Sequence, residues 1–358
     1  MKTMYNLVRP ILFMIQPDFV HWLTIQMLRA GGGLQINRIL IQSMFRVKQD
    51  GPPVQAFGLN FANPIGLAAG YDKDGNAWQG LACLGFGHIE IGTVTCRPQP
   101  GNPFPRLNRL VEDKAVINRN GFRNRGAAYM LHHLRRSKPN GLILGVNIGR
   151  NKDTPVEQTT QDYLELVNTF SSVADYLAVN VSSPNTPELR DLQAPRELEN
   201  LLTPLKISRD KIAADSGKRT PILVKLAPDL TDHQLDDALE AIVRCEMDGV
   251  IISNSSLSRP KLISKQADKA GGLTGLPIRD LNTRLVARSV NLLGGCLPVI
   301  ASGGVMSSAD AQTKLDAGAC LVQLYTGLIY AGPGLVRDCI NAGLTLREEK
   351  MKTEALFV

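Results

Sequence analysis

The stretch NVSSPNTPELRDL (180–192) places amides and hydroxyls directly after an apolar run. Asn180, Ser182, Ser183 and Asn185 crowd around a proline. Serine, asparagine and proline are common turn formers, so the cluster alone is compatible with a loop that has no chemical role. Whether the cluster has a chemical role depends on the rest of the chain.

A single cation interrupts a second apolar run, ILVKLA, at Lys225. Lysine is rarely buried without a partner. No acid occupies a comparable position in another strand-like run, which favours an anionic ligand over a structural salt bridge. Two glycine-containing segments, Gly303-Gly304 and YTG (325–327), each precede a helix-like stretch. Such loops can bind phosphate through backbone N–H groups, so a phosphate-bearing cofactor or substrate is expected.

Short apolar runs alternate with longer amphipathic stretches along most of the chain. This alternation indicates a parallel sheet covered by helices, and eight such units predict an α/β fold of the (β/α)8 TIM-barrel type. A doubly wound open sheet is the alternative, but no GxGxxG motif follows the first strand. Polar residues late in several strands would then meet at one mouth of the barrel. The eight predicted strands are 64–70, 88–94, 142–149, 176–183, 221–228, 249–255, 298–304 and 321–327.

The N-terminal segment has a different character from the rest. Two apolar stretches, MYNLVRPILFMIQ and DFVHWLTIQML, are separated by Pro17 and end at GGG. Both are too short to span a bilayer, and neither matches a signal or transit peptide. Either this helical hairpin packs its apolar surface on the main domain, or it lies in a membrane interface. We therefore expect three parts: residues 1–45, a barrel over 46–345 and a tail over 346–358.

Composition limits the other function classes. The 358 residues are 44% hydrophobic and 20% charged, as in ordinary globular proteins. The net charge of +7 is not concentrated in a block of Lys and Arg, so no nucleic-acid partner is expected. Six dispersed cysteines with no CxxC argue against a metal site, a cluster or a disulfide framework.

These motifs together closely resemble the dihydroorotate dehydrogenase family, in particular its class 2, quinone-dependent branch. The resemblance implies a barrel with one non-covalently bound FMN per chain. It implies oxidation of (S)-dihydroorotate to orotate in de novo pyrimidine (UMP) biosynthesis, with ubiquinone or menaquinone as oxidant. The segments that carry it are GLAAGYDKDG, GFGHIEIGTVT, RPQPGNPFPRLNRL, NRNGF, NIGRNKDTP, NVSSPNTPELR, KLAPDL, GGLTG and GGV.

The resemblance also implies roles for single residues. Ser183 would be the catalytic base; class 1 relatives carry cysteine there. Lys225 would stabilise the reduced flavin. Quinone-site candidates are His21, Arg109 and Tyr325. The implied substrate residues are Lys73, Asn118, Arg119, Asn120, Gly121, Phe122, Asn180, Asn185, Asn254 and Ser255. The implied cofactor residues are Ala69, Gly70, Lys73, Thr93, Asn147, Asn180, Lys225, Ser253, Gly275, Gly304, Tyr325 and Thr326.

The resemblance places the chain, through its N-terminal hairpin, on the cytoplasmic side of a bacterial inner membrane as a peripheral protein. It implies no metal and no obligatory protein partner. Tyr71, Cys96 and Asn120 depart from the residues usual in the family.

Three other readings are less consistent with the residues. A soluble class 1 enzyme using fumarate or NAD is disfavoured by Ser183 and by the hairpin. A tRNA dihydrouridine synthase should carry a catalytic cysteine and a helical domain after the barrel, yet only about thirty residues follow the last strand. A non-catalytic lipid- or quinone-binding barrel would not need Ser183, Lys225 and the glycine loops together.

Overall fold

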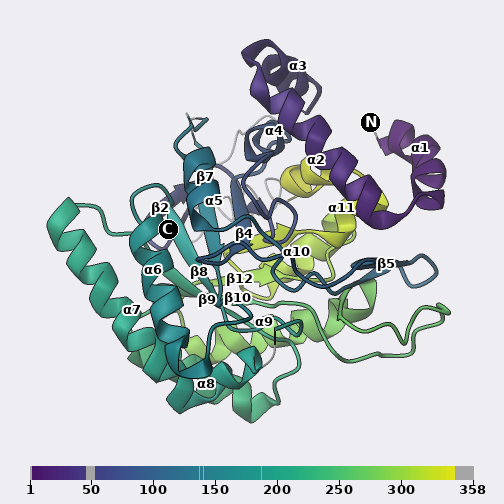
Figure 1. Ribbon diagram of the computed structural model, residues 1–358. Helices are drawn as coiled ribbons and strands as arrows, with labels where there is room; N and C mark the ends of the chain where they lie inside the picture. Colours follow the sequence, from purple (N-terminus) through teal and green to yellow (C-terminus); the bar gives the residue numbers. More distant parts are fainter. Residues whose placement is uncertain (1, 46–52, 137, 140, 187, 343–358) are drawn as a thin grey trace, which may run out of the picture.

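The chain folds around a closed barrel of eight parallel strands (Figure 1). The computed structural model describes residues 2–45, 53–136, 138–139, 141–186 and 188–342, with the side chains of 2–4 left undescribed. The predicted junction at residue 46 and the predicted tail over 346–358 lie outside these residues.

All eight predicted strands are barrel strands, so the TIM-barrel prediction is confirmed and the open sheet is excluded. Their side chains are almost entirely buried, as expected for strands covered on both faces. Neighbours around the barrel follow the order β10-β12-β13-β3-β4-β7-β8-β9. In chain order the strands are β3 (Ile65–Leu67), β4 (His88–Val94), β7 (Ile143–Ile148), β8 (Tyr176–Asn180), β9 (Ile222–Leu226), β10 (Gly249–Ile252), β12 (Val299–Ser302) and β13 (Leu321–Leu324).

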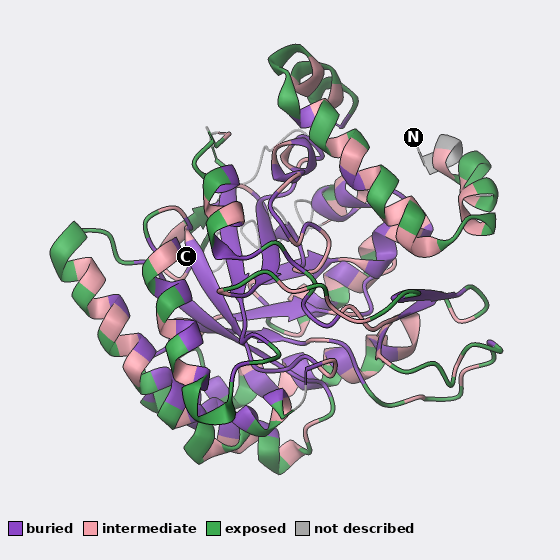
Figure 2. Cartoon of the chain, viewed as in Figure 1, coloured by how far each residue is buried: buried purple, intermediate pink, exposed green. Residues whose placement is uncertain are grey.

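Helices surround the strands and bury their apolar sides against them (Figure 2). The start of helix α8 is fixed by local sequence, because Thr231 and Gln234 form a reciprocal capping box there. The barrel helices are α4 (Trp78–Ala82), α5 (Ala127–Leu134), α6 (Thr159–Phe170), α7 (Pro195–Ser216), α8 (Asp232–Arg244), α9 (Arg279–Leu293), α10 (Ser308–Asp316) and α11 (Thr326–Ala331). Within the described part of the chain, short 3-10 turns lie at Val156–Gln158, Leu189–Gln193 and Leu276–Ile278.

Among the described residues, two small sheets accompany the closed barrel. A hairpin of β1 (Val54–Ala56) and β2 (Leu59–Phe61) packs against residues from the N-terminal ends of the barrel strands. At the other end, β5 (Leu107–Leu110), β6 (Ala115–Asn118) and β11 (Gly272–Gly275) form an antiparallel sheet with its own apolar core. One end of the barrel is therefore plugged, while the other carries a sheet beside its mouth.

The N-terminal segment forms three helices: α1 (Lys2–Met14), α2 (Pro17–Gly33) and α3 (Gln35–Phe45). The first two match the predicted apolar stretches, but GGG forms the last turn of α2 instead of ending the helix before it. Its role is close packing: a Cβ on Gly32 would lie 2.3 Å from Gly80 N in α4. The glycines let two helix backbones approach each other.

Polar anchors hold α1 and α2 beside the mouth. The Tyr5 hydroxyl donates to Ile329 O at 2.6 Å, and Arg9 donates to Tyr330 O at 2.8 Å. Asp18 accepts the backbone N–H of Arg106 at 3.1 Å. Large apolar side chains nevertheless remain exposed along all three helices, including Leu7, Ile11, Met14, Phe19, Trp22, Met27, Ile36, Ile39 and Met44 (Figure 2). Within the described ranges, no helix combines the length and hydropathy needed to cross a bilayer.

Candidate active site

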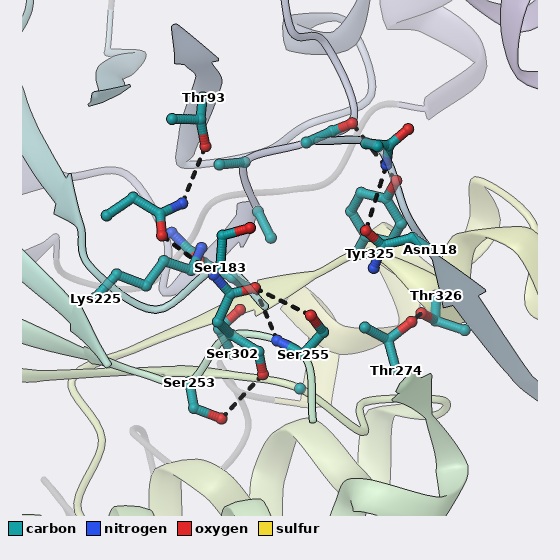
Figure 3. Close-up of a pocket in the computed structure, with 18 of the residues that line it drawn as sticks. Thr93, Asn118, Ser183, Lys225, Ser253, Ser255, Thr274, Ser302, Tyr325 and Thr326 are labelled. Carbon is teal, nitrogen blue, oxygen red and sulfur yellow. Dashed lines mark hydrogen bonds between the residues drawn. The ribbon is translucent and has the colours of Figure 1, made fainter. Parts of the chain in front are cut away.

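A cavity opens at the C-terminal ends of the barrel strands. Its walls come from strand ends, from the loops that follow them and from the sheet beside the mouth (Figure 3). The position is the one at which TIM-barrel enzymes place their active sites.

Most of the predicted site residues meet in this cavity, although they come from distant parts of the sequence. Arg119 instead lines a separate surface groove beside Pro184, and Asn147 lies beneath the cavity wall. Those that line it are Ala69, Gly70, Lys73, Thr93, Asn118, Asn120, Gly121, Phe122, Asn180, Ser183, Asn185, Lys225, Ser253, Asn254, Ser255, Gly275, Gly304, Tyr325 and Thr326.

Ser183 lies on the loop that leaves β8. Its side chain is buried and lines the cavity, and its Oγ accepts the backbone N–H of Asn185 at 3.3 Å. The Tyr163 hydroxyl fixes the end of β8 by donating to Asn180 O at 2.8 Å. A loop with only a turn-forming role has no need to bury its hydroxyls around a cavity. The arrangement therefore favours a chemical role for the NVSSPN segment.

The asparagines form an amide network around the cavity that consists of two hydrogen-bonded groups. Asn185 Nδ2 reaches Asn118 O at 3.3 Å. Asn254 Nδ2 donates to Asn180 Oδ1 at 3.3 Å, and Asn180 Nδ2 donates to Thr93 Oγ1 at 3.0 Å. Because each amide is held by another, the remaining donors and acceptors are fixed for a planar polar ligand.

Lys225 has an acidic partner, so the prediction that no acid is available to it was wrong. Its Nζ lies 3.1 Å from Glu90 Oε1, and both side chains are buried. Glu90 lies within β4 in the run HIEIGTV, three strands away from β9 around the barrel. Barrel closure brings the two inward-facing side chains together, which a strand-by-strand reading does not reveal.

A second cation, Lys73, lies on the loop after β3 and donates to Gly70 O at 2.6 Å. Burial, together with the nearby Arg123 cation, lowers the pKa of Lys73 to about 8. Lys73 is therefore mainly charged at neutral pH, and an anion bound beside it would favour the charged form further.

The opposite side of the cavity has the features of a phosphate cradle. Gly304 adopts φ +71°, and a Cβ there would lie 2.3 Å from Arg279 Cα, so only glycine lets the backbone approach closely. Gly275, with φ +105°, and Thr326 line the same side. Away from this side, where its Nε2 donates to Glu90 near Lys225, Gln323 has a buried Oε1 without a hydrogen-bond partner among the described residues, leaving an acceptor for a ligand donor. These features fit an elongated ligand that ends in a phosphate.

The quinone-site candidates do not share one cavity. His21 lines a second pocket, between α2 and the barrel, while Tyr325 lines the main cavity. Tyr71 connects them, with ring centroids 5.1 Å from His21 and 5.9 Å from Tyr325. Burial and the Lys73 cation lower the pKa of His21 to about 3, which makes it neutral. Arg109 donates to the carbonyls of Leu12 and Ile15, at the turn between α1 and α2.

Some lining residues were not predicted: Ala68, Thr274, Ile278, Ser302, Val305 and Gln323. Gln323 could have been found, because it is a polar residue inside the apolar strand LVQL, as Lys225 is in its own strand. Thr274 could not have been found, because it reaches the cavity through the pairing of β11 with β6, which are more than 150 residues apart in the sequence.

Comparison with known proteins gives consistent matches. A family model described as dihydroorotate dehydrogenase matches residues 53–345. A dihydroorotate dehydrogenase (quinone) of Stutzerimonas stutzeri strain A1501 is 46% identical over 347 residues, covering 97% of this chain and 99% of the relative. One of Pseudomonas aeruginosa strain LESB58 is 47% identical over 340 residues, covering 95% and 98%. A crystal structure of DHODH from Eimeria tenella in complex with ferulenol matches with a TM-score of 0.84 and 34% identity, covering 92% of this chain and 91% of that one.

Proposed function

The chain belongs to the dihydroorotate dehydrogenase family, and from that premise we propose that it oxidises (S)-dihydroorotate through one non-covalent FMN in the barrel mouth. The reaction yields orotate for pyrimidine biosynthesis, and a quinone is the final oxidant. The observation that carries the proposal is the convergence of Ser183, the amide network and two lysines on one cavity.

The cavity residues divide by chemistry. The glycine side, with Gly275, Gly304 and Thr326, would hold the FMN phosphate. Lys225 and Gln323 would face the flavin ring. When bound, FMN supplies the acceptor for the hydride from substrate C6. The amide network and Lys73 would hold dihydroorotate against Ser183, and Asn147 would act through Thr93 and Asn180.

Ser183 would remove the proton from C5 of dihydroorotate. A serine is a weak base, so its action requires a fixed substrate and stabilisation of the negative charge that develops. Lys73 and the amide N–H groups, which line the same cavity, would provide this positive charge and these donors. In Figure 3, Ser183 and Lys225 lie on one side of the pocket, with Asn118 and Tyr325 on the other.

The N-terminal helices would form the quinone entrance and the membrane contact. Their exposed apolar side chains support this role, as does the aromatic series His21, Tyr71 and Tyr325 leading to the cavity. Arg109 would support the entrance by holding the α1–α2 turn. We place this surface on the cytoplasmic side of a bacterial inner membrane, with residues 1–45 as the contact and 46–345 as the barrel.

Rapid anaerobic mixing of the purified protein with dihydroorotate tests the proposal. The expected result is bleaching of the flavin absorption with formation of orotate. Reduction by NADH or fumarate-dependent turnover without quinone would instead indicate a class 1 enzyme. Failure of dihydroorotate to reduce a bound flavin would overturn the proposed function.

A further inference from the structure

Glu90 is a carboxylate in the interior of the barrel, where an apolar residue would be the ordinary choice. It is fully buried on β4. Burying an ionised carboxylate is costly unless other groups pair with it and donate hydrogen bonds to it. A group of this kind calls for an explanation other than packing.

Four donors surround the carboxylate. Oε1 accepts from Asn147 Nδ2 at 2.9 Å and lies 3.1 Å from Lys225 Nζ. Oε2 accepts from Gln323 Nε2 at 2.8 Å and from the Tyr176 hydroxyl at 3.2 Å. Burial alone would raise the pKa of Glu90, but Lys225 and the hydrogen bonds lower it below its ordinary value, which keeps Glu90 ionised.

The network connects directly to the main cavity. Lys225 and Gln323 line the cavity, whereas Glu90 does not. Asn147 joins Glu90 to Thr93, whose Oγ1 donates to Asn147 Oδ1 at 2.5 Å. Among the described residues, the Lys225 ammonium donates a hydrogen bond to Glu90, and it has three protons to donate. The remaining protons are available to a ligand in the cavity.

We propose that Glu90 is a positioning residue that fixes Lys225 and Gln323 against the bound cofactor and, through its charge, limits how strongly Lys225 stabilises the reduced flavin. The proposal rests on the proposed function, because it requires FMN in the cavity. A cation near the flavin favours the form that carries more negative charge. A carboxylate in contact with that cation offsets part of its field, and the low dielectric of the barrel interior strengthens both effects.

The test is the midpoint potential of bound FMN in Glu90→Gln, measured beside the wild type under the same conditions. Glutamine keeps the shape and an acceptor oxygen but removes the negative charge. The reduced form should be favoured by about tenfold or more, which raises the two-electron potential by about 30 mV or more. An unchanged or lowered potential, with FMN still bound, would overturn the proposal.

Two further variants separate charge from structure. Tyr176→Phe removes another hydrogen bond to Glu90 without changing any charge, so its potential should shift much less than that of Glu90→Gln. An equal shift would show that the effect is structural. The second comparison uses the Lys225→Gln variant as a background. Glu90→Gln should shift the FMN potential less in this background than it does in the wild type. Equal shifts in the two backgrounds would show that Glu90 does not act through Lys225.

If Glu90→Gln does not fold, Glu90→Asp takes its place. Aspartate keeps the charge but withdraws it from Lys225 by one methylene, so a smaller rise in potential is expected. An unchanged potential in the folded Glu90→Asp variant would overturn the proposal. A wild-type protein that fails to bind FMN would instead contradict the proposed function.

Discussion

At the scale of single residues, the site depends on polar side chains held in fixed positions by other polar side chains. Ser183 is buried, its loop is bonded through Asn185, and β8 is fixed by Tyr163. Lys225 is held by Glu90 from across the barrel. Because these side chains are already held in place, they need little rearrangement when a ligand binds and reacts.

Replacement of Ser183 by alanine tests the assignment of the base. FMN should remain bound, because the hydroxyl is not needed for the phosphate cradle. Flavin reduction by dihydroorotate should slow by roughly 10²–10⁴-fold, the usual contribution of a general base. Stopped-flow measurement of the reduction gives the rate. In the wild type this rate should rise with pH, because the serine must lose its proton.

Ser182→Ala is the matched control for this change. The Ser182 hydroxyl is equally buried but does not line the cavity. Its replacement should slow reduction far less, through the lost contact with Asn254 at 3.1 Å. If both variants reduce at near wild-type rate, the proton is removed elsewhere.

Lys73 predicts a pH dependence of orotate binding. Its pKa is lowered to about 8, so the cation is present below this pH and is lost as the pH rises through it. A bound anion raises that pKa, so orotate affinity should fall at alkaline pH. The fall should reach about tenfold or more, since hydrogen bonds to charged groups contribute about 1.5–3 kcal/mol.

Calorimetry or flavin-difference spectra with orotate measure this dependence. Lys73→Met should bind orotate weakly at all pH values, with a flat profile over the same interval. An unchanged pH profile in Lys73→Met would assign the titration to another group.

At the scale of elements, the strands carry the site and the N-terminal helices carry the apolar surface. α1 exposes Leu7 by 74%, Ile11 by 63% and Met14 by 88%. These positions are three or four residues apart and therefore lie near one face of the helix. A soluble protein rarely leaves such a surface uncovered without a binding role.

Replacement of Leu7, Ile11 and Met14 together by serine should abolish binding to vesicles, measured by sedimentation, while FMN stays bound. Ile207→Ser is the matched control: Ile207 is 62% exposed on α7, far from the N-terminal helices, and its loss should leave vesicle binding unchanged. Undiminished binding of the triple variant would place the membrane contact elsewhere.

The elements also show how far the sequence could predict this protein. The eight strands were predictable because each is a near-continuous apolar run, and Ser183 and Lys225 stood out as polar residues against such runs. The Glu90–Lys225 pair was not predictable, since it depends on barrel closure. Nor were β11 and its sheet, because polar residues and glycines interrupt these short strands and the strands pair over long separations. The packing of Gly32 on α4 likewise requires the assembled structure.

At the scale of the whole molecule, the chain would separate two half-reactions in space. The main cavity would take dihydroorotate, while the pocket lined by His21 would take the quinone. Tyr71 and Tyr325 lie between them. This arrangement predicts that the two half-reactions can be uncoupled by removing part of the N-terminal segment.

Deletion of residues 1–14 is the appropriate truncation, because Ile25 and Gly32 of α2 are buried and help to cover α4. The shortened protein should keep FMN and be reduced by dihydroorotate at a near-normal rate. Its oxidation by a long-tailed quinone should fall sharply in steady-state assays. Unchanged quinone turnover would show that α1 is not part of the entrance.

The most direct test of the account is an anaerobic titration of the purified protein with dihydroorotate, followed by the visible absorption of the flavin. The purified protein should be yellow, with about one FMN per chain. Its absorption should be bleached as an equal amount of orotate forms, and it should return on addition of a quinone. A colourless protein that binds no added FMN, or a bound flavin that dihydroorotate does not bleach, would contradict it.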